Sequence, residues 1–557
     1  MSLLNIGSTA LNANQAALST TSYNISNINT DGYNRQRTEF GTSLPNFEGS
    51  HYLGSGVNVE SVKRLFDDFL ATQVRVFTSQ ESQSNTVFEF ARQVDDLLGS
   101  PELSLSSGFE DFFDSVNEVA NDPTSIPARQ VMLTQADILA NRFNTLSEQL
   151  SGFKDQVNLN LEQNVKDINN LTKGIAEVNQ AILEASSSKS IPPNDLLDQR
   201  DQLINELSSL VSVSTIKESD GSVNVFIGSG QAVVVGKTDV SLSIVPNASD
   251  PTQNEIGYGP NQIMISNQLS GGSIGGLLTV RNDVISAAES DMDALAASVT
   301  NVMNEQHQKG VTLSGAAGGN LFLPTGADAA SIRLAITDPR DIAVGLPVLA
   351  SNNVANTGTA QVDIASIDGA TPLTLPLLAS NITLSYDATT QQFTITDGVD
   401  SATFAYDPTL QSGSDIDLST ATSGWATPVD LSVTVSGVPA NGDVITIGNS
   451  SANGDNRNAL ALADLQVAKL LNGNSQSFGD FYGVLVANVA TRTQQAEVGQ
   501  KTQSGLLNQT VQRYESVSGV NLDEEAANLI KFQQSYQAAA QIISVSNTVF
   551  NALLTAV

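Results

Sequence analysis

Residues 529–557 read LIKFQQSYQAAAQIISVSNTVFNALLTAV and form a long segment without Gly or Pro. Apolar and small residues recur in it at alternating steps of three and four. The members of this row are Leu529, Phe532, Tyr536, Ala539, Ile543, Ser546, Phe550, Leu553 and Val557. Such spacing is typical of a coiled-coil seam and covers about four heptads. We therefore expect a helix whose seam packs against another helix.

A second apolar row runs beside the first on the same predicted helix. Its members are Ile542, Val545, Val549, Ala552 and Ala556. One seam serves a single partner, so two seams require two partners or burial inside something larger. Periodicity alone leaves two interpretations open. The chain ends either lie in the core of an ordinary helical bundle or also pack between subunits of a polymer.

The other end of the chain carries a matching helical pattern over residues 3–28. Leu4, Leu11, Leu18 and Ile25 recur every seven residues and define one face. We expect this helix to stop near residues 29–32, where Gly32 suits a left-handed C-cap or turn. Small residues at both chain ends permit close packing between many helices, which favours the polymer.

Between these ends the chain alternates between helical and strand-like patterns. Helical spacing predicts helices at residues 62–98, 109–120, 128–185, 196–211 and 277–307, and again with interruptions from 458 onward. Period-two alternation predicts hairpins at about 212–270. Residues 341–455 contain a dozen Asp but no Lys or Arg, among short β-like runs. The predicted fold class is α+β multidomain: a terminal coiled-coil domain, a long-helix bundle with β hairpins, and an inserted all-β domain.

Composition excludes several classes of function. Among 557 residues there are 25 Lys+Arg and 58 Asp+Glu, a formal net charge of −33, which argues against nucleic-acid binding. There is no Cys, so disulfides and thiolate sites are excluded. The start lacks a signal-peptide pattern, and no apolar run is long enough to span a membrane. We expect no membrane insertion, and export, if it occurs, by a route that leaves the N-terminus uncleaved.

The features that could carry chemistry are weak. Gly228-Ser229-Gly230 is typical of a turn, and residues 271–276, Gly-Gly-Ser-Ile-Gly-Gly, look like a flexible lead-in to a helix without the Lys-Ser/Thr of a P-loop. Asp415 and Asp417 lack the spacing of a calcium loop, although a weak divalent site in the acidic insert stays open. A structural or surface role is expected for the two histidines, His51 and His307, and a core role for Trp425. We predict no enzyme, no catalytic residue, no cofactor and no resident metal.

Two terminal motifs resemble those of a known family. Residues 23–36, YNISNINTDGYNRQ, resemble the N-terminal signature of flagellar rod, hook and hook-associated proteins. Residues 519–529, GVNLDEEAANL, and 532–540, FQQSYQAAA, resemble the C-terminal partner of that signature. Residues 194–201, NDLLDQRD, and 272–278, GSIGGLL, resemble segments of the hook-associated protein 1 family, whose members form the hook–filament junction.

This resemblance implies a structural subunit that self-assembles into a tubular layer through its two ends, which pair as a coiled coil. It places the assembly interface at Leu4, Leu11, Leu18, Ile25, Leu529, Phe532, Tyr536, Ile542, Ile543, Val545, Val549, Phe550 and Leu553. The turn of the family motif falls at Asn27, Thr30, Gly32 and Tyr33. The implied domains are 1–60 plus 505–557, 61–340 plus 456–504, and 341–455.

The partners that the resemblance implies are copies of the chain itself, the hook protein, hook-associated protein 3, the flagellar export apparatus and a secretion chaperone. The implied location is the extracellular flagellum, reached by flagellar type III export. One position departs from the family pattern, because Asp31 stands where Pro is usual. We expect the turn to survive, with the Asp31 side chain capping it by a hydrogen bond.

Three alternatives remain open from the sequence. The β insert could act as a secreted adhesin or glycan-binding domain, and Asp pairs in it could serve an enzyme. Within the resembled family, another rod or hook axial protein is the nearest rival.

Overall fold

The computed structural model describes residues 3–44, 46–48, 51–188, 193–369, 371–425, 427–450 and 454–556. Within these ranges the side chains of 46–48, 51–53, 186–188, 553, 554 and 556 are not described. The chain forms two compact units. Unit 1 comprises Met1–Arg92, Phe153–Val284 and Arg492–Val557, and unit 2 comprises Gln93–Gly152 and Ile285–Thr491.

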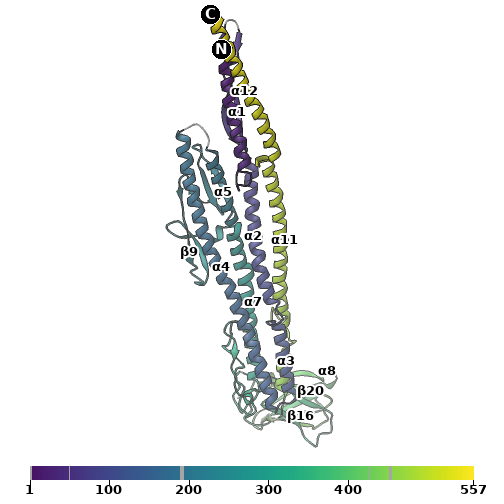
Figure 1. Cartoon of the computed structure of the whole chain (residues 1–557). Coiled ribbons are helices and arrows are strands. Elements are labelled where there is room, and N and C mark those ends of the chain that lie inside the picture. The colour runs from purple at the N-terminus through teal and green to yellow at the C-terminus, as the bar shows by residue number, and fades with distance from the viewer. Residues whose placement is uncertain are drawn as a thin grey trace. The chain divides into compact units, whose positions relative to one another are not determined.

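Long helices dominate both units (Figure 1). They are α1 (Leu3–Ser26), α2 (Asp68–Leu98), α3 (Leu105–Asn121), α4 (Ile126–Ser188), α5 (Asn194–Leu210), α6 (Gly272–Thr279), α7 (Ser286–Gln308), α10 (Arg457–Asp464), α11 (Phe478–Ser518) and α12 (Leu522–Ala556). Every helix expected from periodicity forms, and α4 runs unbroken over 63 residues. None of the helices within the described ranges combines the length and the apolar character that crossing a bilayer requires.

Among its described residues unit 1 carries four small antiparallel sheets, and residues 212–270 form the predicted hairpins. Two of the sheets are strand pairs, β1 (Gln36–Thr42) with β4 (Val57–Arg64) and β2 (Asn46–Glu48) with β3 (His51–Leu53). The third sheet has the strand order β5 (Val213–Lys217), β6 (Val223–Ile227), β7 (Gln231–Val235) and β8 (Thr238–Asp239). The fourth has the order β11 (Ile263–Met264), β10 (Asn254–Tyr258) and β9 (Leu242–Pro246). Gly228 and Gly230 lie in the turn between β6 and β7, as expected.

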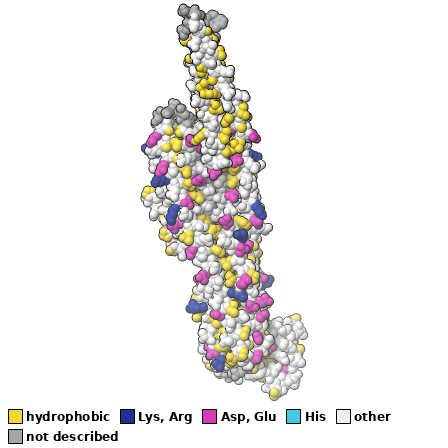
Figure 2. Space-filling model, in the orientation of Figure 1, with side chains coloured by type: hydrophobic (Ala, Val, Ile, Leu, Met, Phe, Trp, Pro, Cys, Tyr) yellow, Lys and Arg dark blue, Asp and Glu magenta, His cyan; other side chains and the backbone are white. Residues whose placement is uncertain are grey.

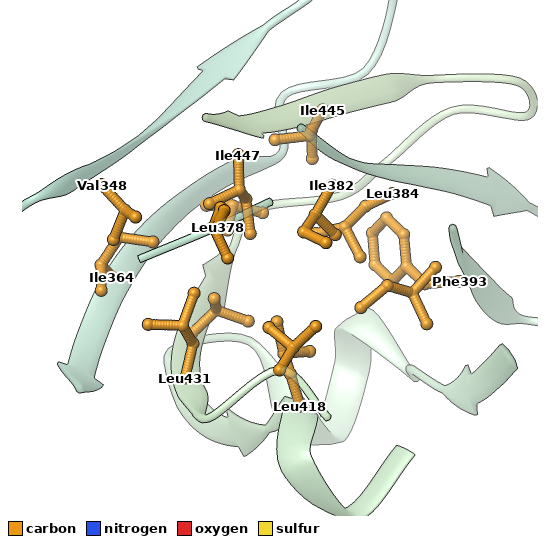
Figure 3. Close-up of a cluster of buried hydrophobic side chains, with 14 of the residues drawn as sticks. Val348, Ile364, Leu378, Ile382, Leu384, Phe393, Leu418, Leu431, Ile445 and Ile447 are labelled. Atoms are coloured by element: carbon orange, nitrogen blue, oxygen red, sulfur yellow. The ribbon is translucent and has the colours of Figure 1, made fainter. Parts of the chain in front are cut away.

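Unit 2 contains the all-β insert, whose described residues form a sandwich of two antiparallel sheets with the one-turn helices α8 (Pro408–Gln411) and α9 (Leu418–Ala421) between strands. The short strand pair β12 (Phe322–Leu323) and β13 (Arg333–Leu334) precedes the insert in the chain. One sheet orders β14 (Val348–Asn352), β21 (Val444–Asn449), β16 (Ile382–Asp387), β17 (Gln392–Thr396) and β18 (Ser401–Ala405). The other orders β15 (Gln361–Ile367), β20 (Leu431–Ser436) and β19 (Ser414–Asp417). Apolar side chains that alternate along the strands of both sheets point into one shared core (Figure 3). Trp425 belongs to that core, as predicted.

The insert leaves and rejoins the rest of unit 2 at one place. Its first strand β14 pairs with its last strand β21, and Val348 lies opposite Asn449. One residue further out, the Ser450 amide donates a 2.7 Å hydrogen bond to the Pro347 carbonyl. The two connections to the insert are therefore neighbours.

The predicted helix at 62–98 was wrong at its start. Val62 and its neighbours continue β4, which ends at Arg64. The helix begins only at Asp68 because the Asp67 carboxylate accepts hydrogen bonds from the Phe69 and Leu70 amides and caps it. Val57 and Val59, separated by the polar Asn58, were the strand signal that helical spacing obscured.

The flexible lead-in expected at residues 271–276 was also wrong. Gly272 already begins α6, and a Cβ added to it would lie 2.2 Å from the Val211 nitrogen. A Cβ on Gly276 would lie 2.7 Å from the Thr86 Cβ. The glycines are there because backbones approach closely. The helix expected at 277–307 thus starts earlier, and a π-helical turn, Val280–Ile285, separates α6 from α7.

Candidate functional site: the terminal helix pair and its polar base

Helices α1 and α12 pack along each other and form the terminal helix pair, with N and C at the same end (Figure 1). The two helices approach closely at Gly7, because a Cβ there would lie 2.7 Å from Cγ1 of Ile543. The predicted seam of α12 is turned inward over much of its length. Ala539 and Ser546 are buried, and Leu529, Phe532, Tyr536 and Ile543 are half-buried.

The second row of α12, which we call the outer row, is exposed. Its members Ile542, Val545 and Val549 expose 39%, 58% and 48% of their surface. Phe550, near the end of the seam, exposes 62%, and the Leu553 side chain lies outside the described residues. Figure 2 shows hydrophobic side chains, in yellow, gathered over the terminal helix pair.

On α1 the structure buries small and polar residues rather than the leucine row. Leu4 is exposed, and Leu11, Leu18 and Ile25 are half-buried. The buried residues of α1 are Gly7, Ala13, Ala17, Thr21 and Asn24. Most of them are spaced by three or four residues, so their spacing could have predicted a buried face of small residues. The prediction followed the periodicity of the large apolar side chains instead.

The family-motif turn follows α1 and is held by its own side chains. The Thr30 hydroxyl donates to the Asn27 side-chain oxygen at 3.2 Å, and the Tyr33 amide donates to the Thr30 carbonyl at 3.2 Å. Gly32 has a φ of +77°, and a Cβ there would lie 2.7 Å from the Gln202 side chain. The positive φ is what favours glycine here, because the Gln202 side chain is flexible and could move aside, and the predicted left-handed position is confirmed.

Asp31 does not have the predicted capping role. The turn forms without it, since within the described part of the chain no hydrogen bond of the Asp31 carboxylate is found, and the residue is exposed. Asn27 and Thr30 supply the local hydrogen bonds instead.

Asn24 locks the turn to the strand that follows it. Its side chain donates to the Gln36 carbonyl at 2.8 Å and accepts from the Gln36 amide at 2.9 Å. The Tyr33 hydroxyl donates to the Asn24 oxygen at 2.7 Å, and burial raises the pKa of Tyr33 well above its ordinary value. The phenol therefore stays protonated and remains a donor at physiological pH.

Arg35 fastens the beginning of the chain to its end. Its Nε lies 2.7 Å from Glu525, and its terminal nitrogens lie 2.8 and 2.9 Å from the Glu524 carboxylate. The Glu525 side chain is only 2% exposed, so this pair is buried on its acidic side. The hydrogen bond from Arg35 lowers the pKa of Glu524. The Arg35 amide also donates to the Ser518 carbonyl at 2.8 Å.

A second charged cluster ties the motif turn to α5. The Asp198 carboxylate accepts from the Asn34 amide at 3.1 Å, from the Asn34 side chain at 2.6 Å and from Arg64 at 2.8 Å. Asp201 pairs with Arg64 at 2.8 Å and Arg75 at 3.2 Å. Burial raises the pKa of Asp198, and the bonds from Arg64 and Asn34 oppose that rise. We call Asn34, Arg35, Arg64, Arg75, Asp198, Asp201, Glu524 and Glu525 together the polar base.

The polar base was not predicted as a site. Residues 194–201 were recognised only as a family segment, and Arg35 only as part of a motif. The available signal was the presence of several charged residues within the motifs, such as Asp198 and Asp201 in 194–201 and Glu524 and Glu525 in 519–529. Their pairing partners lie far away along the chain, so spacing alone could not identify the pairs.

The histidines and the insert aspartates considered as candidate functional residues make structural contacts wherever their side chains are described. His307 is completely buried: Nδ1 donates to the Gly319 carbonyl at 2.7 Å, and Nε2 accepts from the Ala343 amide at 2.9 Å. Asp417 caps α9 and Asp415 accepts from Thr434. Among the described residues no group of three or more metal-ligating side chains comes together. The His51 side chain lies outside the described residues.

Comparisons with known proteins agree with this architecture. Three family models match: flagella basal body rod protein over residues 4–34, the flagellar hook-associated protein FlgK helical domain over 91–322, and the C-terminal region of flagellar basal body rod FlgEFG protein over 511–556. The terminal helix pair and its motifs thus define the class of flagellar rod, hook and hook-associated proteins.

Relatives of full length narrow that class. Flagellar hook-associated protein 1 of Salmonella typhimurium is 32% identical over 99% of both chains, and that of Bacillus subtilis is 25% identical over 98% of this chain and 96% of its own. The solved hook junction protein FlgK of Burkholderia pseudomallei matches with a TM-score of 0.71 and 25% identity, over 80% of this chain and all of its own. The chain belongs to the flagellar hook-associated protein 1 family. This family consists of structural flagellar proteins and is not known for catalysis.

Proposed function

We propose that this chain is a structural subunit of the bacterial flagellum that joins the hook to the filament by self-assembling through α1 and α12. The observation that carries the proposal is the outer row, an apolar row left exposed on a helix whose inner seam is already occupied. Each large apolar side chain buried between subunits would contribute roughly 1.5–3 kcal/mol. A handful of such side chains per subunit would therefore offset the cost of ordering the ends.

The proposal includes the interface residues on both helices. Subunits would contact one another through Ile542, Val545, Val549 and Phe550, while Leu529, Phe532, Tyr536 and Ile543 hold α12 against α1. An isolated helix pair of this length is marginal in water, and contact with neighbouring copies would complete its stabilisation. The division into 1–60 plus 505–557, 61–340 plus 456–504, and 341–455 remains part of the proposal.

The names of the relatives support a place in the flagellum, and the individual partners are part of the proposal. A hook-associated protein that joins hook to filament would contact the hook protein, hook-associated protein 3 and copies of itself, outside the cell. Passage through the flagellar export apparatus and binding of a secretion chaperone belong to the same proposal.

The decisive experiment replaces the outer row in the full chain. The triple variant Ile542→Asn/Val545→Asn/Val549→Asn should leave the purified monomer helical by circular dichroism, because these side chains are exposed. In a strain that lacks its own copy, it should produce hooks without filaments and release flagellin into the medium.

A control removes valines elsewhere that are more exposed than the outer row. Val354→Asn/Val399→Asn changes two insert residues that are 103% and 90% exposed, and it should restore filaments. Normal filaments from the triple variant would overturn the proposal.

A further inference from the structure

Charge is distributed unevenly along this chain. Residues 1–30 and 532–557 contain no Asp, Glu, Lys, Arg or His, so all 58 acidic and 25 basic residues lie between Asp31 and Lys531. All of α1 and all of α12 beyond Lys531 are therefore without a charged side chain. Figure 2 shows the contrast, since the terminal helix pair is yellow and white while magenta and blue are spread over the rest.

The polar surface of the terminal helix pair consists of neutral groups. On α12 the exposed polar residues beyond Lys531 are Gln533, Gln534, Gln537, Gln541, Ser544, Asn547, Thr548, Asn551 and Thr555. Gln15 is similarly exposed on α1. Amides and hydroxyls both donate and accept hydrogen bonds without carrying a fixed charge, so they can hydrogen-bond to other amides and hydroxyls across an interface.

Charged side chains border this surface. Lys531 lies one residue before the uncharged part of α12, and Arg35 pairs with Glu524 and Glu525 in the polar base. The strands β1 and β4, which pack against α1, also carry charged side chains, and there Arg37 and Lys63 pair with Glu39.

The chain as a whole carries a net charge of −33, so copies repel wherever their charged surfaces meet. Burying a fixed charge in a contact also requires removing its hydration, which an imperfect partner does not replace. A contact made only of apolar and amide groups avoids both costs. A second copy of this chain presents the same uncharged surface, whereas a partner with charged side chains would have to bury them unpaired.

We propose that the uncharged part of the terminal helix pair is an electrically neutral contact surface whose occupant is the same surface of a second copy. The inference rests on the proposed function and adds the rule that selects the partner. Absence of charge, rather than complementary charge, permits this contact, so a fixed charge of either sign is excluded from it.

The test introduces single charges into the full chain at exposed glutamines. Gln541→Glu and Gln541→Lys on α12, and Gln15→Glu on α1, keep side-chain length and helix propensity nearly unchanged. In a strain that lacks its own copy, each should lower the fraction of hooks that carry a filament at least tenfold. The uncharged Gln541→Met should lower it less than twofold. Gln494→Glu, at an exposed glutamine of α11, provides the charge control and should behave as the wild type.

The outcomes separate the two proposals. If all charged variants form filaments while the outer-row triple variant does not, the neutral-surface rule is wrong and the proposed function stands. If only Gln541→Glu fails and Gln541→Lys assembles, the occupant is an acidic surface, which also overturns the rule. If the triple variant assembles normally, the proposed function itself fails. Circular dichroism of each purified monomer should match the wild type, and a variant that loses helix is replaced by the same change at Gln537.

Discussion

Arg35 and Glu525 are separated by almost the whole chain and yet form the contact that joins its two ends. Neither residue could be identified as a pair from the sequence, because nothing local indicates a partner so distant. Gly32 is the opposite case. A turn that ends a helix requires a left-handed residue, so its role could be predicted.

Arg35→Met should destabilise the base of the terminal helix pair by about 3 kcal/mol, because it leaves the buried Glu525 carboxylate without its partner. Hydrogen exchange of the α12 amides near Glu525 measures the change. The double variant Arg35→Met/Glu525→Met should recover most of the loss. Arg37→Met removes an exposed pair 3.6 Å from Glu39 and should change stability by less than about 0.5 kcal/mol. Equal effects of the two single variants would contradict this account.

His307 should make unit 2 sensitive to acid. Burial lowers its pKa from 6.5 to about 4, so the folded protein keeps the ring neutral while the unfolded chain binds a proton below pH 6.5. Stability is therefore retained above pH 6.5 and falls as the pH drops toward 4, by roughly 3 kcal/mol in total. Urea unfolding of the wild type and of His307→Gln across this range isolates the contribution as the difference in slope. Identical slopes would show that His307 does not carry it.

At the scale of elements, periodicity predicted the existence of the helices well and their starts less well. Apolar rows identify α4 and α12 because many turns repeat the same signal. The start of α2 depends on a single cap, Asp67, and the start of α6 depends on how closely Gly272 approaches the end of α5. Glycine indicates flexibility and close packing equally, and only the tertiary neighbours distinguish them.

Gly272→Ala should lower the stability of unit 1 by at least about 3 kcal/mol, since the new Cβ would overlap the Val211 nitrogen in addition to occupying a φ of +59°. Gly236→Ala is the matched control, because its φ of +57° is similar and nothing lies within 4 Å of the new Cβ. The control should lose only about 1–2 kcal/mol. Chemical denaturation of both variants measures the difference, and equal losses would mean that the close approach does not matter.

At the scale of the whole molecule, the sequence separated the acidic insert from the helical remainder, and the structure explains why it could. Buried residues alternate with less buried ones along the strands β16, β17 and β20, and among the described residues the core draws only on the insert and on Ala317 beside it. The candidate site was harder to predict, because the terminal helix pair depends on segments from both ends of the chain and on α5.

Residues 346–450 should fold when produced alone. Their core is almost self-contained, and β14 and β21 hold the two ends together. Cooperative thermal unfolding with a strand-type circular dichroism spectrum would be the expected result. In the complementary deletion variant, a short Gly-Ser linker from Pro347 to Ser450 should leave the helical remainder folded, with His307 still buried. An unfolded insert together with an intact remainder would show that the sandwich depends on contacts outside it.

The hydrogen bond between Ser450 and Pro347 has a consequence for how the inserted segment can be exchanged. Where a segment departs and returns at adjacent backbone positions, recombination can lengthen, shorten or exchange it without altering the geometry of its host. A segment of another length or sequence could thus replace the sandwich between Pro347 and Ser450, and this junction is a natural position for grafting foreign peptides.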